Sequence, residues 1–138
     1  SAQLMHYNIE LSLSGDEFEV NGLKNEFQQV ILNVINNAKD VLIEQEISQP
    51  CIKINSNADN KSITIQDNAG GIKKSVIDRI FEPYFTTKEQ GKGTGMGLYM
   101  SKMIIEDNMG GNLSVENNKM GACFKIDLIS GSKKSKEQ

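Results

Sequence analysis

Two pairs of short segments with alternating apolar and polar residues most constrain what this chain can fold into. The first pair is 51–57 with 62–67, and the second pair is 112–117 with 122–128. Strict alternation is typical of strands that bury one face, and a short polar turn joins antiparallel neighbours. The turns fall around Asp59 and Asn118. The sequence therefore predicts two β-hairpins in a largely antiparallel sheet.

Between the hairpins, apolar residues recur at helical spacing. A long amphipathic helix is predicted over 24–46, a short helix over 73–81, and a second long helix over 96–109 that stops at Gly110 and Gly111. Helices with one apolar stripe must cover one face of such a sheet. We therefore expect an α/β (α+β) two-layer sandwich with about five strands and three helices.

Near the N-terminus, alternation over 4–13 predicts a further strand, and 18–20 predicts a short one. Five apolar residues of the first strand share a face: Met5, Tyr7, Ile9, Leu11 and Leu13. The single histidine, His6, is expected on the opposite, exposed side. Cys51 and Cys123 stand in strand-like apolar runs and are predicted to be buried, reduced thiols.

Size and charge exclude several classes of function. The chain has 138 residues, which suits one domain, and its net charge of −3 favours neither nucleic acid nor an anionic membrane as a partner. No apolar run approaches the roughly 20 residues that span a bilayer, and no signal peptide is recognised. We expect a cytoplasmic domain over 1–129 and a disordered polar tail over 130–138.

A polar stripe flanks the apolar face of the first long helix. Asn33, Asn37 and Asp40 stand four and three positions apart, so they share one side of the helix. An asparagine carbonyl is a hard oxygen ligand suited to Mg²⁺ that also binds nucleotide phosphates. A solvated helix side explains the stripe equally well at this point.

The segment "DNAGGI", 67–72, follows a strand directly. If Asp67 is buried, its carboxylate can accept a hydrogen bond from the exocyclic amine of adenine. In guanine an oxygen stands at that position, so two acceptors would face each other. Gly70 and Gly71 would let a ligand approach the backbone. Alone, the segment also fits an ordinary turn.

The loop over 82–95 is long enough to suggest a function. In "FEPYFTTK", the aromatic residues Phe81, Tyr84 and Phe85 can anchor a mobile segment or dock a partner, and Lys88 adds a cation. Gly93, Gly95 and Gly97 then read G-x-G-x-G before a helix, which fits neither the P-loop nor the dinucleotide pattern. Such glycines form an anion-binding concavity, or simply a flexible linker.

Taken together, five motifs resemble the N, G1, F, G2 and G3 boxes of two-component sensor histidine kinases. In chain order they are "NVINNA", "DNAGGI", "FEPYFTTK", "GKGTGMGL" and "GACF". The resemblance covers about 5–129. It implies the ATP-binding (HATPase, Bergerat-type) catalytic fold, which type II topoisomerases, ninety-kilodalton heat-shock chaperones and mismatch-repair ATPases share. That fold has a mixed sheet, three helices and a mobile ATP lid, here at about 82–93.

The resemblance also implies a site for the cofactors ATP and Mg²⁺. Asn37 would ligate Mg²⁺, with Asn33 near the metal and its waters, and Asp67 would accept the adenine amine. The other implied nucleotide-binding residues are Gly71, Ile72 and Phe124 for the base, and Thr87, Lys88, Gly93, Gly95, Met96, Gly97 and Leu98 for the phosphates. Asp40 stands where many of these kinases have a basic or aromatic residue, so no phosphate contact is assigned to it.

Asn33 helps to choose within the superfamily. The chaperone and topoisomerase branch has a glutamate there as base for water, and an amide cannot take that proton. The resemblance therefore implies a kinase that phosphorylates a histidine on a separate dimerisation domain of the same protein and that works with a response regulator receiver domain. His6 is not expected to be the acceptor, so no catalytic residue is assigned and this chain alone should not autophosphorylate. A non-catalytic nucleotide-sensing module and an anti-sigma-type serine kinase remain the alternatives.

Overall fold

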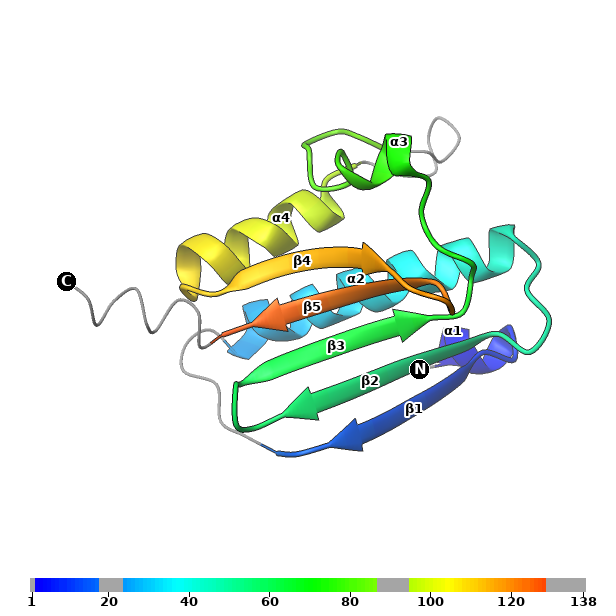
Figure 1. The fold of residues 1–138 in the computed structure, drawn as a ribbon, viewed down its shortest axis with the longest axis horizontal. Helices are drawn as coiled ribbons and strands as arrows, with labels where there is room; N and C mark the ends of the chain where they lie inside the picture. Colours follow the sequence, from blue (N-terminus) through cyan, green and yellow to red (C-terminus); the bar gives the residue numbers. More distant parts are fainter. Residues whose placement is uncertain (1, 18–23, 87–94, 129–138) are drawn as a thin grey trace.

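The computed structural model describes residues 2–17, 24–86 and 95–128 (Figure 1). The helices are α1 (Ala2–His6), α2 (Lys24–Glu44), α3 (Lys74–Ile77) and α4 (Gly97–Met103), which continues as the π-helix η1 (Ile104–Asn108). The strands are β1 (Glu10–Gly15), β2 (Cys51–Asn57), β3 (Ser62–Asp67), β4 (Asn112–Asn117) and β5 (Ala122–Asp127).

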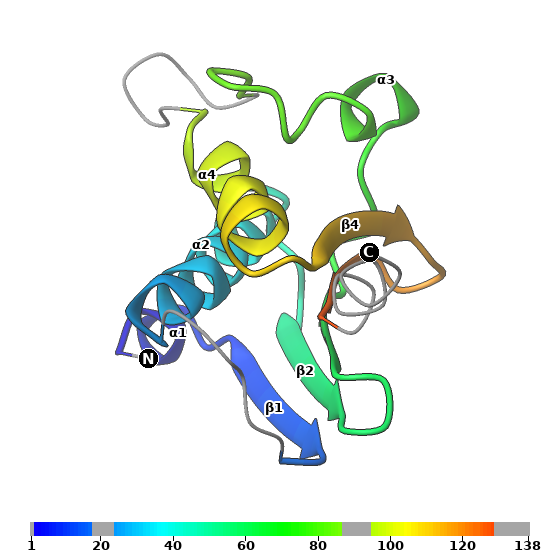
Figure 2. The same ribbon diagram turned by 90° about the vertical axis from the view of Figure 1, so that its left-hand side faces the viewer.

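The strands form one five-stranded sheet in the order β1-β2-β3-β5-β4. β1 runs parallel to β2, and the other neighbours are antiparallel. α2 and α4 lie against one face of this sheet (Figure 2). The predicted mixed, largely antiparallel sheet in a two-layer α/β sandwich is therefore confirmed, as are both hairpins.

The core lies between the sheet and the helix layer. α2 buries Val30, Val34, Ala38 and Leu42, one residue in every turn. In the sheet, Ile65 of β3 stands between Ile54 of β2 and Phe124 of β5, and Ile65 and Phe124 are fully buried. Each such side chain contributes about 1.5–3 kcal/mol by leaving water. The apolar faces that the helical and strand periodicities predict therefore pack together in one core.

The predicted N-terminal strand is wrong over its first half, because residues 2–6 form α1 and β1 begins only at Glu10. Asn8 adopts a left-handed conformation (φ 58°). The Asn8 amide donates to the Met5 carbonyl and the Ile9 amide to the Leu4 carbonyl (3.1 and 2.9 Å). These two bonds are the Schellman ending of a helix, and Leu4 and Ile9 supply its hydrophobic contact.

Several apolar and sulfur side chains are more exposed than predicted. Met5 is 78% exposed, and Leu13 is also exposed. His6 is exposed as expected, although it ends a helix instead of lying in a strand. Cys51 and Cys123 are free but half-buried instead of buried. Burial and the nearby Glu116 raise the pKa of Cys123, which keeps this thiol protonated.

The other element boundaries differ less. α2 ends at Glu44, two positions before the predicted end, and α3 is shorter than predicted. The long helix after Gly95 changes from α to π at Ile104 and ends where Gly110 turns left-handed (φ 71°), as its sequence predicts. The predicted strand at 18–20 and the predicted tail lie outside the described residues. Within the described ranges, no helix has both the length and the apolar composition needed to cross a membrane.

Candidate functional site

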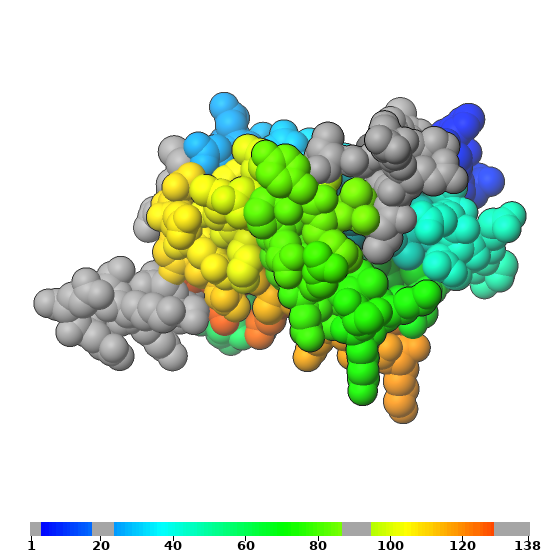
Figure 3. All heavy atoms as spheres, turned by 90° about the horizontal axis from the view of Figure 1, so that it is seen from above, coloured from blue at the N-terminus to red at the C-terminus, as the bar shows by residue number. Residues whose placement is uncertain are grey.

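A pocket of about 650 Å³ opens between α2, the segment from β3 to Thr86, and the start of α4. Figure 3 views the face on which these three parts meet, with α2 in blue to cyan, the middle segment in green and α4 in yellow. The pocket is lined by Asn33, Asn36, Asn37, Asp40, Val41, Glu44, Gln45, Gly71, Ile72, Lys73, Val76, Ile80, Phe85, Thr86, Gly95, Gly97 and Leu98.

The polar stripe of α2 faces this pocket, and its two asparagines have different surroundings. Asn33 Nδ2 donates to Ser101 Oγ (3.0 Å) and to the Gly97 carbonyl (3.3 Å), while Asn33 Oδ1 accepts from Gln29 Nε2 (3.0 Å). Among the described residues, the side chain of Asn37 forms no hydrogen bond to protein. Asn37 can therefore offer its carbonyl oxygen to a ligand.

Asp67 lies at the end of β3 and is only 4% exposed. Its Oδ1 accepts from the amides of Ala69 (3.0 Å) and Ala122 (3.1 Å), whereas Oδ2 has no hydrogen bond within the described part of the chain. Burial raises the pKa of this carboxyl above its ordinary value of 3.8, and the two amides oppose the shift. Asp67 thus presents one fixed oxygen and one available acceptor.

Gly121 and Asn117 support this end of the site from the β4–β5 hairpin. A Cβ on Gly121 would lie 2.3 Å from Asp67 Oδ1, so only glycine leaves room for that carboxylate. Asn117 Oδ1 accepts from the Ile72 amide (2.8 Å), and Asn117 Nδ2 donates to the Ile72 carbonyl (2.7 Å). This pair of bonds fixes Ile72 and the adjacent Gly71 at the pocket wall.

The aromatic segment 81–85 packs against both the sheet and the helix layer. Phe81 meets Phe124 edge-on with ring centroids 6.2 Å apart, and Lys102 Nζ lies 4.8 Å from the Phe81 ring centroid. Tyr84 is 76% exposed and left-handed (φ 65°). A Cβ on Gly95, whose φ is also positive (72°), would lie 2.4 Å from the Tyr84 carbonyl carbon. Gly95 therefore lets the start of α4 pack directly against this segment.

Most of the predicted site residues that the structure describes are brought together. Seven of them line the pocket: Asn33, Asn37, Gly71, Ile72, Gly95, Gly97 and Leu98. Asp67, Met96 and Phe124 are not in the lining, and Phe124 is 1% exposed in the core against Phe81. Thr87, Lys88 and Gly93 lie outside the described residues.

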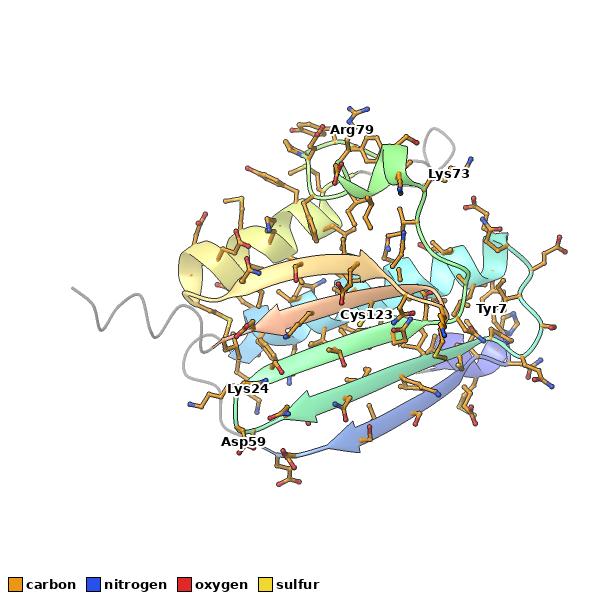
Figure 4. The ribbon with its side chains drawn as sticks, viewed as in Figure 1. Tyr7, Lys24, Asp59, Lys73, Arg79 and Cys123 are labelled. Carbon is orange, nitrogen blue, oxygen red and sulfur yellow. The ribbon has the colours of Figure 1, made fainter. Side chains whose placement is uncertain are left out.

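Sequence reasoning missed several lining residues. Val41 and Glu44 follow Asn37 at helical spacing, so extending the stripe by two turns would have found them. Lys73 follows the "DNAGGI" motif directly, on the segment between β3 and α3 (Figure 4). Gly121 stands in the "GACF" motif without a predicted role, and Asn117 carries no signal of its own, because each acts on a residue far away in the sequence.

The charged side chains that line the pocket suit an anionic ligand that binds together with a cation. Its described lining carries the carboxylates of Asp40 and Glu44 and the ammonium of Lys73. Lys39 Nζ lies 3.5 Å from Asp40 Oδ1 and offsets part of that charge. Nowhere in 2–17, 24–86 or 95–128 do three or more His, Cys, Asp or Glu side chains form a group able to hold a metal ion. A divalent cation here would therefore take part of its oxygen ligands from Asn37 and from the bound ligand.

Comparison with known proteins gives the class. Residues 22–130 match the family described as histidine kinase-, DNA gyrase B-, and HSP90-like ATPase, and the chain belongs to this family. Within it, the similarity is to sensor kinases, as the five motifs predict. The two-component sensor PprA of Pseudomonas aeruginosa is 38% identical over 114 residues, which are 79% of this chain and 12% of PprA. Sporulation kinase A of Bacillus subtilis is 35% identical over 120 residues, 87% of this chain and 19% of that kinase.

Solved structures agree with this similarity. The catalytic domain of histidine kinase ThkA has a TM-score of 0.76 and 30% identity, with 92% of this chain and 82% of that chain covered. ThkA in complex with the response regulator protein TrrA has a TM-score of 0.72 and 26% identity, with 92% and 36% covered. The chain spans less than a fifth of the length of curated relatives that it matches, such as PprA and sporulation kinase A.

Proposed function

We propose that this domain binds Mg²⁺–ATP and transfers the γ-phosphoryl group to a histidine on a separate dimerisation domain of the same protein. The observation that carries the proposal is a pair of available acceptors, Asn37 in the pocket and Oδ2 of the buried Asp67 at the end of β3. The first suits a hard cation, and the second suits the amine of adenine.

The binding roles follow from this arrangement. Asp67 Oδ2 accepts from the adenine amine, and the wall formed by Gly71 and Ile72 packs against the base. The carbonyl oxygen of Asn37 is proposed as a ligand of Mg²⁺. The cation would neutralise the charge of the phosphates, which the carboxylates of Asp40 and Glu44 would otherwise repel. Gly95, Met96, Gly97 and Leu98 are proposed at the phosphates, together with Thr87, Lys88 and Gly93 from outside the described residues.

The side chain at position 33 supports phosphoryl transfer over hydrolysis. An amide cannot take a proton from water near neutral pH, and Asn33 is already bonded to Ser101 and Gly97. Transfer to a well-placed imidazole needs mainly in-line positioning and charge neutralisation. Because ThkA has been solved with the response regulator TrrA, we propose a receiver domain as the next phosphoryl acceptor. We place these reactions in the cytoplasm, where ATP is supplied.

Calorimetric titration with ATP and Mg²⁺ tests the binding site. Asn37→Ala and Asp67→Ala should each weaken binding strongly, and unchanged affinity in both would contradict the site. The transfer step is tested by adding a separate helical dimerisation domain that carries the histidine, with ATP labelled at the γ-phosphate. Tight binding without labelling would favour a nucleotide-sensing module. Labelling of a serine on a partner protein would favour a kinase of the anti-sigma type.

A further inference from the structure

Ser101 of α4 is a polar side chain with no exposure to solvent, and the binding roles proposed above do not use it. Its Oγ donates to the Gly97 carbonyl one turn earlier (2.8 Å) and accepts from Asn33 Nδ2 of α2 (3.0 Å). Gln29 extends the chain of bonds by donating to Asn33 Oδ1 (3.0 Å). Three side chains thus connect α2 to the first turn of α4.

The geometry fixes the orientation of the Asn33 amide. The Gly97 carbonyl can only accept, so the Asn33 atom 3.3 Å from it must be the nitrogen. Since the Ser101 hydroxyl gives its proton to the same carbonyl, it must accept from Asn33. The asparagine oxygen is then turned toward Gln29. Asn33 and Asn37 are one turn apart in one motif, but only Asn37 has a side chain free of protein partners among the described residues.

We propose that Ser101 is a positioning residue that acts through Asn33. Together they hold the first turn of α4, with Gly97 and Leu98, at a set distance from Asn37 across the pocket. This inference rests on the proposed function, because it assigns the held end of the pocket to the phosphates of the nucleotide. Loss of the hydroxyl should therefore affect binding of the triphosphate and leave binding of the base and sugar unchanged.

The test compares Ser101→Ala with Ser62→Ala in affinity for Mg²⁺–ATP and for adenosine. Ser62 is a matched control, because it is a buried serine with one side-chain hydrogen bond, at the first position of β3. Ser101→Ala is expected to weaken ATP binding about fivefold, which corresponds to about 1 kcal/mol, the usual worth of one hydrogen bond. Adenosine affinity should stay within about twofold, and Ser62→Ala should change neither affinity.

Two further variants separate positioning from general destabilisation. Ser101→Thr restores the hydroxyl and should recover the ratio of ATP to adenosine affinity even if the added methyl group lowers the melting temperature. In an Asn33→Ala background, Ser101→Ala should add less than about twofold, because the pair acts as one unit. If Ser101→Ala does not fold, Ser101→Cys tests the same ratio with a weaker acceptor.

Each possible result either supports or contradicts the positioning role of Ser101. Equal losses for ATP and adenosine, or none for either, would overturn the positioning role while leaving ATP binding by the wild type intact. Additive losses in the double variant would also overturn it. Failure of the wild-type domain to bind Mg²⁺–ATP would overturn the proposed function and, with it, this inference.

Discussion

Replacement of Asp67 with asparagine changes one carboxylate oxygen into an amide nitrogen and removes the charge. Asparagine keeps an acceptor for the amides of Ala69 and Ala122, which now bond to Oδ1 at 3.0 and 3.1 Å. The fold is therefore expected to survive. At the second position an acceptor becomes a donor, so the side chain would meet the adenine amine donor to donor.

The magnitude follows from the one bond that is lost. A hydrogen bond to a charged acceptor contributes about 1.5–3 kcal/mol, so Asp67→Asn should weaken ATP binding about 10- to 150-fold. GTP should gain relative to ATP, because the new amine can donate to the guanine oxygen. Calorimetric titration with both nucleotides measures this. Asp59→Asn, at the exposed hairpin turn far from Lys73 in Figure 4, is the control for loss of charge alone.

The pH dependence of stability and of ATP affinity supplies an independent check, because the two are expected to change in opposite directions. Because burial raises the pKa of Asp67 above 3.8, the folded chain holds this proton more tightly than the unfolded chain. The resulting stabilisation is fully present below 3.8 and is lost as pH rises through the folded pKa. ATP affinity should change the other way, falling as the carboxylate is protonated.

Urea unfolding of wild type and Asp67→Asn over the same pH range measures the first effect, and nucleotide titration measures the second. Equal ATP affinity in the two proteins would refute the assignment of Asp67 to the base. A stability difference between them that does not vary with pH would refute the reasoning about burial.

Three other changes have expected outcomes set by packing and hydrogen bonds. Gly121→Ala places a methyl group 2.3 Å from Asp67 Oδ1 and should lower the free energy of unfolding by about 1–3 kcal/mol in denaturant titrations. Asn117→Ala removes both bonds to Ile72 and should cost about 1–3 kcal/mol by the same assay, with weaker binding of adenosine. Gly95→Ala should weaken ATP binding more than Gly91→Ala, since Gly95 packs on the Tyr84 backbone with φ at 72°; the reverse order in calorimetry would contradict this.

The sheet could be predicted because its strands bury one face and so alternate strictly. In β2 and β3, strand bounds and turn match the sequence pattern residue for residue. The N-terminus shows the limit of that argument. Leu4 and Ile9 are the buried pair, and they are five positions apart because the end of α1 and its left-handed cap at Asn8 separate them. An apparent alternation of Met5 and Tyr7 concealed this ending.

The candidate site divides in the same way. Residues within one motif, such as Asn33 with Asn37 or Gly71 with Ile72, share the pocket because a helix or turn brings near neighbours to one side. The supporting residues could not be found in this way. Asn117 bonds to Ile72 across 45 positions, and Ser101 bonds to Asn33 across 68. Such contacts depend on the strand order and on how α4 packs against α2, which no local pattern specifies.

The surroundings of Asn33 also sharpen the distinction between kinase and hydrolase. In their sequences, the two classes of enzyme differ in whether the side chain at position 33 can act as a base for water. In the structure, that position faces the Gly97 carbonyl, which accepts from Asn33 Nδ2, and Ser101, whose proton is already given to that carbonyl. A glutamate carboxylate there would stand against an acceptor and would have to draw the Ser101 proton away from Gly97. The amide is therefore part of how α4 is held, and a carboxylate at position 33 would break the present bonds between Asn33, Ser101 and Gly97.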